Sequence, residues 1–436
     1  MCPQNARTGL GMIGMRRSLP AVVSLLVVAP LALAGCGDDA GRPAQATWVA
    51  SGAPSTAPSV SPDSSAPSVA PGGGGSLNVT PVAGKKGVPI SAEIGFALSG
   101  GKVTAVVLKD DKGKTVSGAL REDGSSWVPA KPLKNSRGYV ASVTAVDAAG
   151  QSRTETTSFT TRAEGGPLTG TGLYLFDGNT YGVAMPVVVE FNPGIKQKDR
   201  AAVQKRMFVK SSPAQPGTWS WTSSGTQAFY RPPNFWRSGT KLSVRIAVEG
   251  LPTGGGRYGD LDRSADAEIG RSFVMKVDNE SKKMTVTQDG AVVKSIPVSL
   301  GRKKYPSASG TMVVMEKKRK TVFDTRGEFP AEDAYRVDVE YAQRLTWSGQ
   351  YIHAAEWSVA DQGRRNVSHG CVNVSQANGQ WLFERTLIGD PITIRGTENE
   401  VAYGNGWTPW DVSWKEFVKG SALPVPAELA AQAGEA

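Results

Sequence analysis

The only two histidines of the chain lie close in sequence to one of its three cysteines. His353 precedes Cys371 by 18 positions, and His369 precedes it by two. A thiol with an ordinary pKa of about 8.5 is mostly protonated at neutral pH, so it needs a neighbouring base to become a nucleophile. An imidazole can accept that proton and later deliver it to a leaving amine. The grouping therefore predicts nucleophilic acyl transfer at Cys371.

The residues around Cys371 suit a tight turn at such a site. Gly370 lacks a Cβ, which permits a sharp turn and a close approach of substrate. Consecutive backbone N–H groups at the turn can bind the oxyanion of a tetrahedral intermediate. His353 comes from a separate segment and can approach the thiol freely, whereas the side chain of His369 can point elsewhere and brace the loop. We therefore favour His353 as the base over His369.

The pattern His-x14-Ser-His-Gly-Cys-x-Asn resembles the signature of the L,D-transpeptidases, which carry a YkuD-type catalytic domain. Its positions are held by His353, Ser368, His369, Gly370, Cys371 and Asn373. The spaced upstream histidine makes this match more specific than a bare Ser-His-Gly-Cys. The resemblance extends over residues 270–420 and implies that Cys371 is the nucleophile and His353 the base.

The same resemblance assigns supporting roles near the nucleophile. The backbone carbonyl of Ala354 would orient the imidazole of His353, although relatives often carry serine at this position. His369 and Asn373 would support the loop, and Ser368 would line the site.

Three aromatic residues match substrate-facing positions of the family. Tyr335 resembles the tyrosine of the lid, and Trp357 matches a pocket tryptophan. Phe323 stands where relatives commonly have methionine, which puts the details of specificity in doubt.

The resemblance implies a reaction in two steps that needs no cofactor and no metal. Cys371 would attack the carbonyl of the third residue of a donor tetrapeptide in peptidoglycan and release the terminal D-alanine. The side-chain amine of the third residue on an acceptor stem would then resolve the thioester. Carbapenems would acylate the same thiol. Cell-wall biogenesis and cell shape are the expected processes.

Three alternatives remain at this point. An L,D-carboxypeptidase of the same family would use water as the acceptor. A zinc site could be built from His353, His369 and Cys371, with Asp361 as a fourth ligand, although no second cysteine or further histidine could close a structural site. A non-catalytic adhesin would bury His353 and Cys371 in a core.

The N-terminus has the features of an exported lipoprotein. Arg16 and Arg17 precede a short apolar run that ends in Leu-Ala-Gly-Cys36. A positive segment, an apolar segment and small residues before the cut are typical of a signal peptide, and the run is shorter than a membrane span. The cysteine resembles that of a bacterial lipobox, which carries lipid; an ordinarily cleaved signal is the alternative. We expect a protein on the outer face of the plasma membrane, with Cys371 as its lone remaining thiol.

The rest of the chain divides by composition and strand pattern. After the signal at 1–36 we expect a disordered Pro/Ser/Gly linker at 37–76 and β-sandwich domains at 77–162 and 163–270. A mostly β catalytic domain with one or two helices follows at 271–396, and a Trp-rich extension at 397–436. This order is similar to the peptidoglycan L,D-transpeptidases of high-GC Gram-positive bacteria, in which both sandwiches are immunoglobulin-like. The aromatic residues of the second sandwich are expected in its core rather than in a sugar-binding platform.

Within the catalytic region, local patterns predict individual elements. Strands are expected at 273–277, 284–287, 292–298 and 392–394, with a hairpin turn at Asp289-Gly290. A helix is expected at 333–345, and Ser375 is expected to cap another.

Spacing and charge predict the tail and the surface. Trp407, Trp410 and Trp414 are spaced to share one helical face, and we expect them to pack back against the catalytic domain and to reach the sandwich before it. A surface patch for a partner or for glycan strands is the alternative. The net charge of +10 favours anionic surroundings such as cell-wall polymer. The short basic runs at 302–304 and 317–320 are interpreted as solvated, with no nucleic-acid role.

Overall fold

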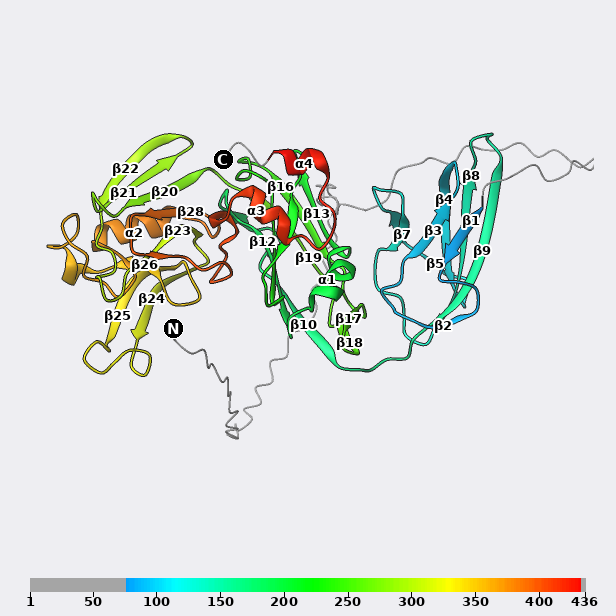
Figure 1. Ribbon diagram of the computed structural model, residues 1–436, viewed down its shortest axis with the longest axis horizontal. Helices are drawn as coiled ribbons and strands as arrows, with labels where there is room; N and C mark the ends of the chain where they lie inside the picture. The colour runs from blue at the N-terminus through cyan, green and yellow to red at the C-terminus, as the bar shows by residue number, and fades with distance from the viewer. Residues whose placement is uncertain (1–75, 433–436) are drawn as a thin grey trace, which may run out of the picture. The chain divides into compact units, whose positions relative to one another are not determined.

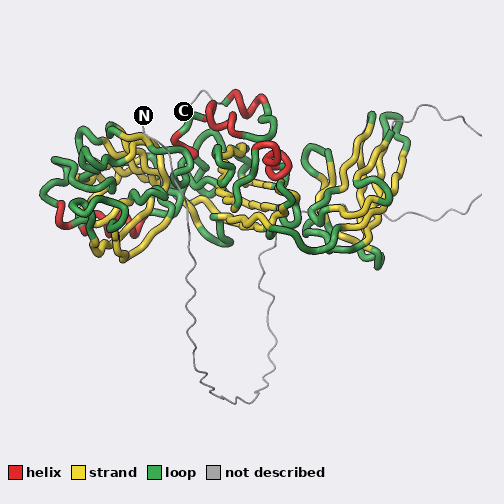
Figure 2. Tube along the Cα trace, turned by 60° about the horizontal axis from the view of Figure 1, so that its bottom comes forward, coloured by secondary structure: helices red, strands yellow, loops and turns green. Residues whose placement is uncertain are grey.

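The computed structural model describes residues 76–432 (Figure 1). The expected signal peptide, the expected lipidation site Cys36 and all but the last residue of the expected linker lie outside the described residues. Strands predominate over helices, which confirms the mostly β expectation (Figure 2). Within 76–432, no helix is long and apolar enough to span a membrane.

Residues 77–161 form two sheets with a shared core. One sheet has the order β1-β3-β7-β6 and the other the order β2-β9-β8-β4-β5. Alternate residues of β8, including Tyr139, Ala141 and Val143, point into the core because side chains alternate along a strand. The strand bounds are β1 Leu77–Thr80, β2 Lys85–Val88, β3 Ile94–Leu98, β4 Lys102–Asp110, β5 Thr115–Val116, β6 Gly118–Leu120, β7 Ser126–Pro129, β8 Gly138–Val146 and β9 Ser152–Thr161.

Residues 168–269 form a second pair of sheets, with the orders β14-β15-β12-β10-β18-β17 and β11-β19-β16-β13. Trp219, Trp221 and Phe229 are buried between them, as expected for core aromatics. The bounds are β10 Leu168–Leu173, β11 Thr180–Tyr181, β12 Val187–Asn192, α1 Gln197–Gln204, β13 Met207–Ser212, β14 Thr218–Trp221, β15 Gln227–Arg231, β16 Lys241–Ile246, β17 Pro252–Gly254, β18 Arg257–Gly259 and β19 Arg263–Ile269.

The catalytic region is built on a six-stranded sheet, β22-β21-β20-β28-β23-β29, and a four-stranded sheet, β24-β25-β26-β27. The predicted turn at Asp289-Gly290 joins β21 to β22 with φ values of +49° and +85°. Ser375 caps α2 by accepting the N–H of Asn378, as predicted. The bounds are β20 Phe273–Asp278, β21 Lys283–Gln288, β22 Ala291–Pro297, β23 Ala308–Val313, β24 Glu316–Asp324, β25 Arg336–Arg344, β26 Tyr351–Ala354, η1 Glu356–Ser358, β27 Val372–Val374, α2 Gln376–Arg385, β28 Pro391–Arg395 and β29 Asn399–Glu400.

The helix predicted over 333–345 is wrong. Residues 336–344 are the strand β25, which pairs antiparallel with β24 over most of its length. Val337, Val339 and Tyr341 alternate with polar residues, and β-branched and aromatic side chains at a period of two favour a strand. The pairing with β24 decides the conformation.

The tail consists of short helical turns instead of one helix. The elements are η2 Pro409–Asp411, α3 Trp414–Phe417, η3 Val418–Gly420 and α4 Ala427–Ala431. Trp407 precedes η2, Trp410 lies within it and Trp414 begins α3, so the prediction of one helical face is wrong. Pro409 interrupts any such helix because proline lacks the N–H that an interior position needs. Trp407 and Trp414 are nevertheless buried in a core that combines the second pair of sheets with Val313 and Met315 of the catalytic region, so the expected packing extends to the preceding sandwich.

Candidate active site

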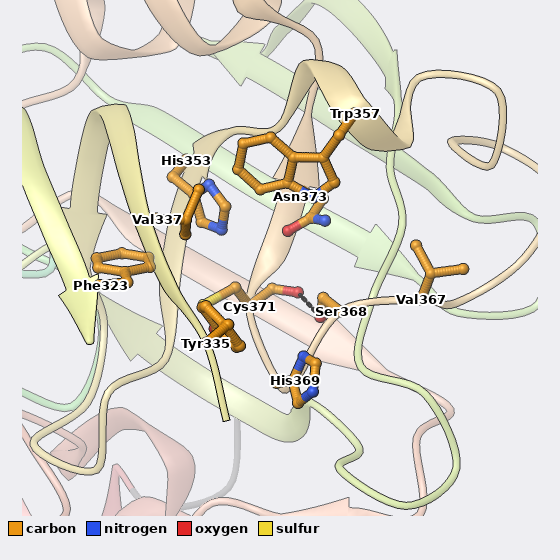
Figure 3. A pocket seen from close by; sticks show the side chains of 10 residues that line it. All are labelled: Phe323, Tyr335, Val337, His353, Trp357, Val367, Ser368, His369, Cys371 and Asn373. Carbon is orange, nitrogen blue, oxygen red and sulfur yellow. Dashed lines mark hydrogen bonds between the residues drawn. The ribbon is translucent and has the colours of Figure 1, made fainter. Parts of the chain in front are cut away.

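The parallel pairing of β26 with β27 brings the two predicted catalytic residues together. His353 lies in β26 opposite Asn373 of β27, and Cys371 immediately precedes β27. The chain between β26 and β27 folds back, so that Cys371 lies beside the strand that carries His353. Figure 3 shows both side chains on the same cavity.

That cavity has a volume of about 360 Å³. Its walls include eight of the residues singled out from sequence: Phe323, Tyr335, His353, Trp357, Ser368, His369, Cys371 and Asn373. Val337 and Val367 complete the lining and were not predicted. Ala354 and Gly370 are not among the lining residues but form hydrogen bonds with His353 and Ser368, which are.

Cys371 is a buried free thiol, with 7% of its surface exposed. It donates a long hydrogen bond to the carbonyl of Gly349, with 3.8 Å between Sγ and oxygen. Burial raises the pKa of the Cys371 thiol to about 12, although the backbone N–H of Tyr351 acts in the opposite direction. The resting nucleophile is therefore a protonated thiol, which requires a base.

His353 is held in the tautomer that a base needs. Its Nδ1–H donates to the carbonyl of Ala354 at 2.8 Å, the contact that the family resemblance implied. A carbonyl can only accept, so the lone pair must reside on Nε2. Burial lowers the pKa of His353 to about 4, while the Ala354 contact acts to raise it. The imidazole is thus neutral at physiological pH and available to accept a proton.

Ser368 shapes the turn that presents the nucleophile. Its Oγ donates to the carbonyl of Cys371 at 2.7 Å and accepts the N–H of Gly370 at 3.1 Å. Gly370 has a φ of +121°, a conformation that side-chain-bearing residues rarely adopt. Ser307 donates to the Gly370 carbonyl at 2.8 Å. Ser307 was not predicted, because it reaches the site only through tertiary structure.

His369 points into a neighbouring cluster. Its Nε2 accepts a hydrogen bond from Arg302 at 2.9 Å, and its ring stacks on Tyr305 with 5.2 Å between centroids. Burial lowers the pKa of His369, and the charge of Arg302 lowers it further. With Nε2 occupied in this way, the geometry favours the bracing role over that of base.

Asn373 offers the cavity an unused acceptor. Its Nδ2 donates to Ser358 at 3.2 Å, whereas its Oδ1 is buried and has no hydrogen-bond partner among the described residues. Because a buried polar atom without a partner is costly, this oxygen is suited to an N–H of a bound ligand.

The three aromatic residues form the outer walls. The ring of Phe323 meets His353 edge-on, with 5.1 Å between centroids. Trp357 lies 5.9 Å from the same imidazole and is 60% exposed. Tyr335 lies 4.9 Å from His369, and its pKa is raised to about 12 by burial, with a contribution from Cys371. The walls are therefore apolar and the polar groups lie at the base.

The zinc alternative lacks the arrangement it requires. Across residues 76–432, no three His, Cys, Asp or Glu side chains are grouped so that they could hold a metal ion. His369 bonds to Arg302 instead.

Two family models match the sequence. A bacterial Ig domain matches residues 85–252, which lie in both of the first two pairs of sheets, and an L,D-transpeptidase catalytic domain of the YkuD type matches residues 272–394.

Individual relatives are similar over most of their length. L,D-transpeptidase 2 of Mycobacterium tuberculosis (strain CDC 1551 / Oshkosh) is 31% identical over 79% of this chain and 85% of its own. L,D-transpeptidase 5 of Mycobacterium tuberculosis (strain H37Rv) is 32% identical over 81% of this chain and 76% of its own. A crystal structure of L,D-transpeptidase 3 from Mycobacterium tuberculosis with a faropenem-derived adduct is 29% identical, covers 52% of this chain and 97% of its own, and has a TM-score of 0.43.

Proposed function

This chain belongs to the L,D-transpeptidase family, as its 31% identity over 85% of L,D-transpeptidase 2 shows, and we propose that it cross-links peptidoglycan stem peptides through a thioester on Cys371. The observation that carries the proposal is that a buried thiol and an imidazole whose Nδ1 is fixed by the Ala354 carbonyl line the same cavity. Both groups line one cavity with an apolar outer wall.

In the acylation step, Sγ of Cys371 attacks the carbonyl carbon of the third residue of a donor tetrapeptide. The thiol proton passes to Nε2 of His353 as the carbon–sulfur bond forms. The tetrahedral intermediate then collapses, the bond to the terminal D-alanine breaks, and His353 returns the proton to the leaving amine. The products are a thioester on Cys371 and free D-alanine.

In the second step, the side-chain amine of an acceptor stem attacks the thioester. His353 accepts a proton from that amine, and the bond to Cys371 breaks to regenerate the thiol. Water in place of the amine would give the carboxypeptidase outcome. A carbapenem would stop at the first step, because opening of its strained ring leaves the acyl group on Cys371.

Burial of both partners determines how the first proton moves. With a thiol pKa of about 12 and an imidazole pKa of about 4, the pair is neutral before substrate binds. A thiolate–imidazolium pair is therefore disfavoured at rest, and proton transfer accompanies attack. His353 stops acting as a general base only when its imidazole is protonated. The acid limb of kcat/KM should therefore lie near pH 4 rather than near the ordinary histidine pKa of about 6.5.

Substitution of the two histidines separates their roles. We expect His353→Ala to reduce carbapenem labelling by roughly 100-fold or more, within the usual range for loss of a general base. His369→Ala should retain substantial labelling, because it braces the loop. Mass spectrometry of intact protein over time measures both rates, with Cys371→Ala as the unlabelled control. Equal rates for His353→Ala and the wild-type protein would refute the role of His353.

A chelator gives the matched test of the metal alternative. Labelling and turnover should be unchanged by EDTA, because the proposed steps use only side chains of the chain. If EDTA removed the activity and added zinc restored it, the result would favour the zinc site instead.

We also propose that Cys36 carries a lipid that holds the protein on the outer face of the plasma membrane. The support is the sequence alone: paired arginines, an apolar run and small residues before the cysteine. Cys36→Ala should move the protein from the membrane fraction to the soluble fraction. Retention in the membrane fraction would show that another anchor exists.

A further inference from the structure

A carboxylate is bound by three donors beside the catalytic cavity. Asp333 accepts a hydrogen bond from the hydroxyl of Tyr305 at 2.9 Å and forms ion pairs with Arg302 and Lys304. All three donors belong to one short segment, 302–305. Only 10% of the Asp333 side chain is exposed, so the donors and their surroundings enclose the carboxylate.

The three donors border the site of the reaction. Arg302 also donates to Nε2 of His369, and Tyr305 stacks on the same ring. His369 in turn lines the cavity that contains Cys371. The Nε of Arg302 is buried and has no hydrogen-bond partner among the described residues. The guanidinium therefore has a donor left for a ligand.

Asp333 comes from the connection between β24 and β25, which also supplies the lid residue Tyr335. Phe329 of this connection stacks on Tyr305 with 4.7 Å between centroids, and Tyr335 contacts His369. The connection thus rests on the 302–305 segment and on His369 through one carboxylate and two rings. The carboxylate of Asp333 is the group in these contacts that a free carboxylate could replace.

We propose that Arg302, Lys304 and Tyr305 form a subsite for a free carboxylate of the donor peptide, and that Asp333 occupies this subsite until the donor displaces it. The inference rests on the proposed function, since a donor stem that ends in D-alanine carries a carboxylate. Two cations and a hydroxyl match the acceptor sites of one carboxylate. Exchange conserves charge, because one carboxylate leaves as another enters.

Partial exposure of the cations makes such an exchange feasible. The side chains of Arg302 and Lys304 are 36% and 55% exposed. Ion pairs in contact with water are weak, because solvent screens them and competes for the same donors. The contact between Lys304 and Asp333 lowers the pKa of Asp333 to about 2, so the occupant is charged whenever a substrate carboxylate is charged.

Direct binding tests the subsite in the Cys371→Ala protein, where no reaction can occur. The probe is N-acetyl-D-alanine, and its neutral control is N-acetyl-D-alaninamide, both measured by NMR titration. Adding Asp333→Asn should tighten binding of the carboxylate by roughly fivefold or more, because the occupant loses its charge. Binding of the amide should stay unchanged. Adding Lys304→Gln to Asp333→Asn should remove the gain.

Asp324 provides the matched control at the start of the same connection. Its carboxylate pairs with Arg326 and Arg336, neither of which lines the cavity. Asp324→Asn therefore frees two arginines without opening the proposed subsite, and it should not tighten probe binding at His369. An equal gain from Asp324→Asn, or no gain from Asp333→Asn, would overturn the proposal.

A second variant covers the possibility that Asp333→Asn disturbs the fold, which its melting curve would reveal. Asp333→Ala removes the same occupant with a different side chain and should also tighten carboxylate binding relative to the Cys371→Ala parent. Unchanged carboxylate binding in this variant would also overturn the proposal. Because binding is measured without catalysis, failure of a tetrapeptide to acylate Cys371 would count against the proposed function and leave this result standing.

Discussion

Arg231 and Arg302 both lie against aromatic rings, yet their contacts differ in kind. Arg231, at the end of β15, is 2% exposed and holds the tail. Its guanidinium donates to the carbonyls of Pro409 at 3.1 Å and Val412 at 2.9 Å. It also lies 4.5 Å from the ring centroid of Trp410 and 4.4 Å from that of Phe417.

Arg302, beside the catalytic cavity, pairs with the carboxylate of Asp333 and remains in contact with water. The difference between the two lies in burial and in the type of partner. Burial lowers the pKa of Arg231 to about 10, and its partners are backbone carbonyls that cannot leave. The partner of Arg302 is a charged side chain that another carboxylate can replace. The guanidinium group of Arg231 therefore makes a permanent contact in the core, whereas that of Arg302 makes an exchangeable contact at the surface.

Removal of the tail should abolish all contacts between the tail and the second pair of sheets, including those of Arg231. Truncation after Thr397 deletes Trp407, Trp414 and Phe417 from the core that they share with the second pair of sheets. Each buried aromatic contributes on the order of 2–3 kcal/mol, and most domains are stable by only about 5–15 kcal/mol. We expect a large fall in melting temperature and weaker acylation of Cys371, even by a small β-lactam. A truncated protein that melts and acylates like the full chain would contradict this.

Arg231→Met should remove only the hydrogen bonds from this side chain to the tail, with the tail itself still present. The methionine keeps apolar contact with the rings, whereas the buried carbonyls of the tail lose their donor. Each buried acceptor left unpaired costs about 1–3 kcal/mol, so we expect a loss near 3 kcal/mol in urea unfolding. Arg200 is the matched control, because it also donates to two carbonyls and lies over Trp221 but is partly exposed. A loss from Arg200→Met as large as that from Arg231→Met would argue that burial is not the deciding factor.

The tail also reaches the nucleophile through Asn405. This side chain accepts the N–H of Ser348 at 3.0 Å and donates to its Oγ at 2.9 Å, next to Gly349, whose carbonyl accepts the thiol. Asn405→Ala should slow acylation by roughly fivefold through misplacement of the thiol, with an unchanged melting temperature. Asn399→Ala, on an exposed tail position, should change neither. An unaltered acylation rate in Asn405→Ala would limit the tail to a role in stability.

Loss of the lid contact should have the smallest effect on stability. Asp333→Asn removes a charge whose cation partners are partly exposed, and ion pairs that water screens contribute little. We expect the melting temperature to change by no more than about 2 °C. High salt should make the wild-type and variant curves coincide. A fall comparable to that of Arg231→Met would show that the lid contact is structural rather than exchangeable.

The sequence predicted which residues line the cavity better than it predicted their more distant contacts. His353, Cys371 and their neighbours form one motif. His353 lies in the short strand β26 and Cys371 immediately precedes the short strand β27, so the local pattern was sufficient. Ser307 and Gly349 contact the same turn from distant segments, and no local pattern marks such contacts. The basic run at 302–304 was interpreted as solvated, whereas Arg302 and Lys304 bind Asp333.

The wrong elements have a common cause. Residues 333–345 were assigned to a helix from local sequence and the three tail tryptophans from helical spacing. Pairing with β24 and burial against the second pair of sheets instead decide their conformations. Tertiary contacts override weak local preferences. The hairpin at Asp289-Gly290 and the cap at Ser375 were predicted correctly, because each depends on a few adjacent residues.

The central claim is that Cys371 forms a thioester with a donor peptide. Its most direct test is mass spectrometry of the intact protein incubated with a disaccharide-tetrapeptide. The account predicts a mass increase equal to the donor minus D-alanine, located on Cys371, followed by a cross-linked dimer; Cys371→Ala should show neither. A tripeptide product without a dimer would indicate the carboxypeptidase activity. An unmodified Cys371 in a protein that still forms product, or the same adduct on Cys371→Ala, would contradict the assignment of the nucleophile.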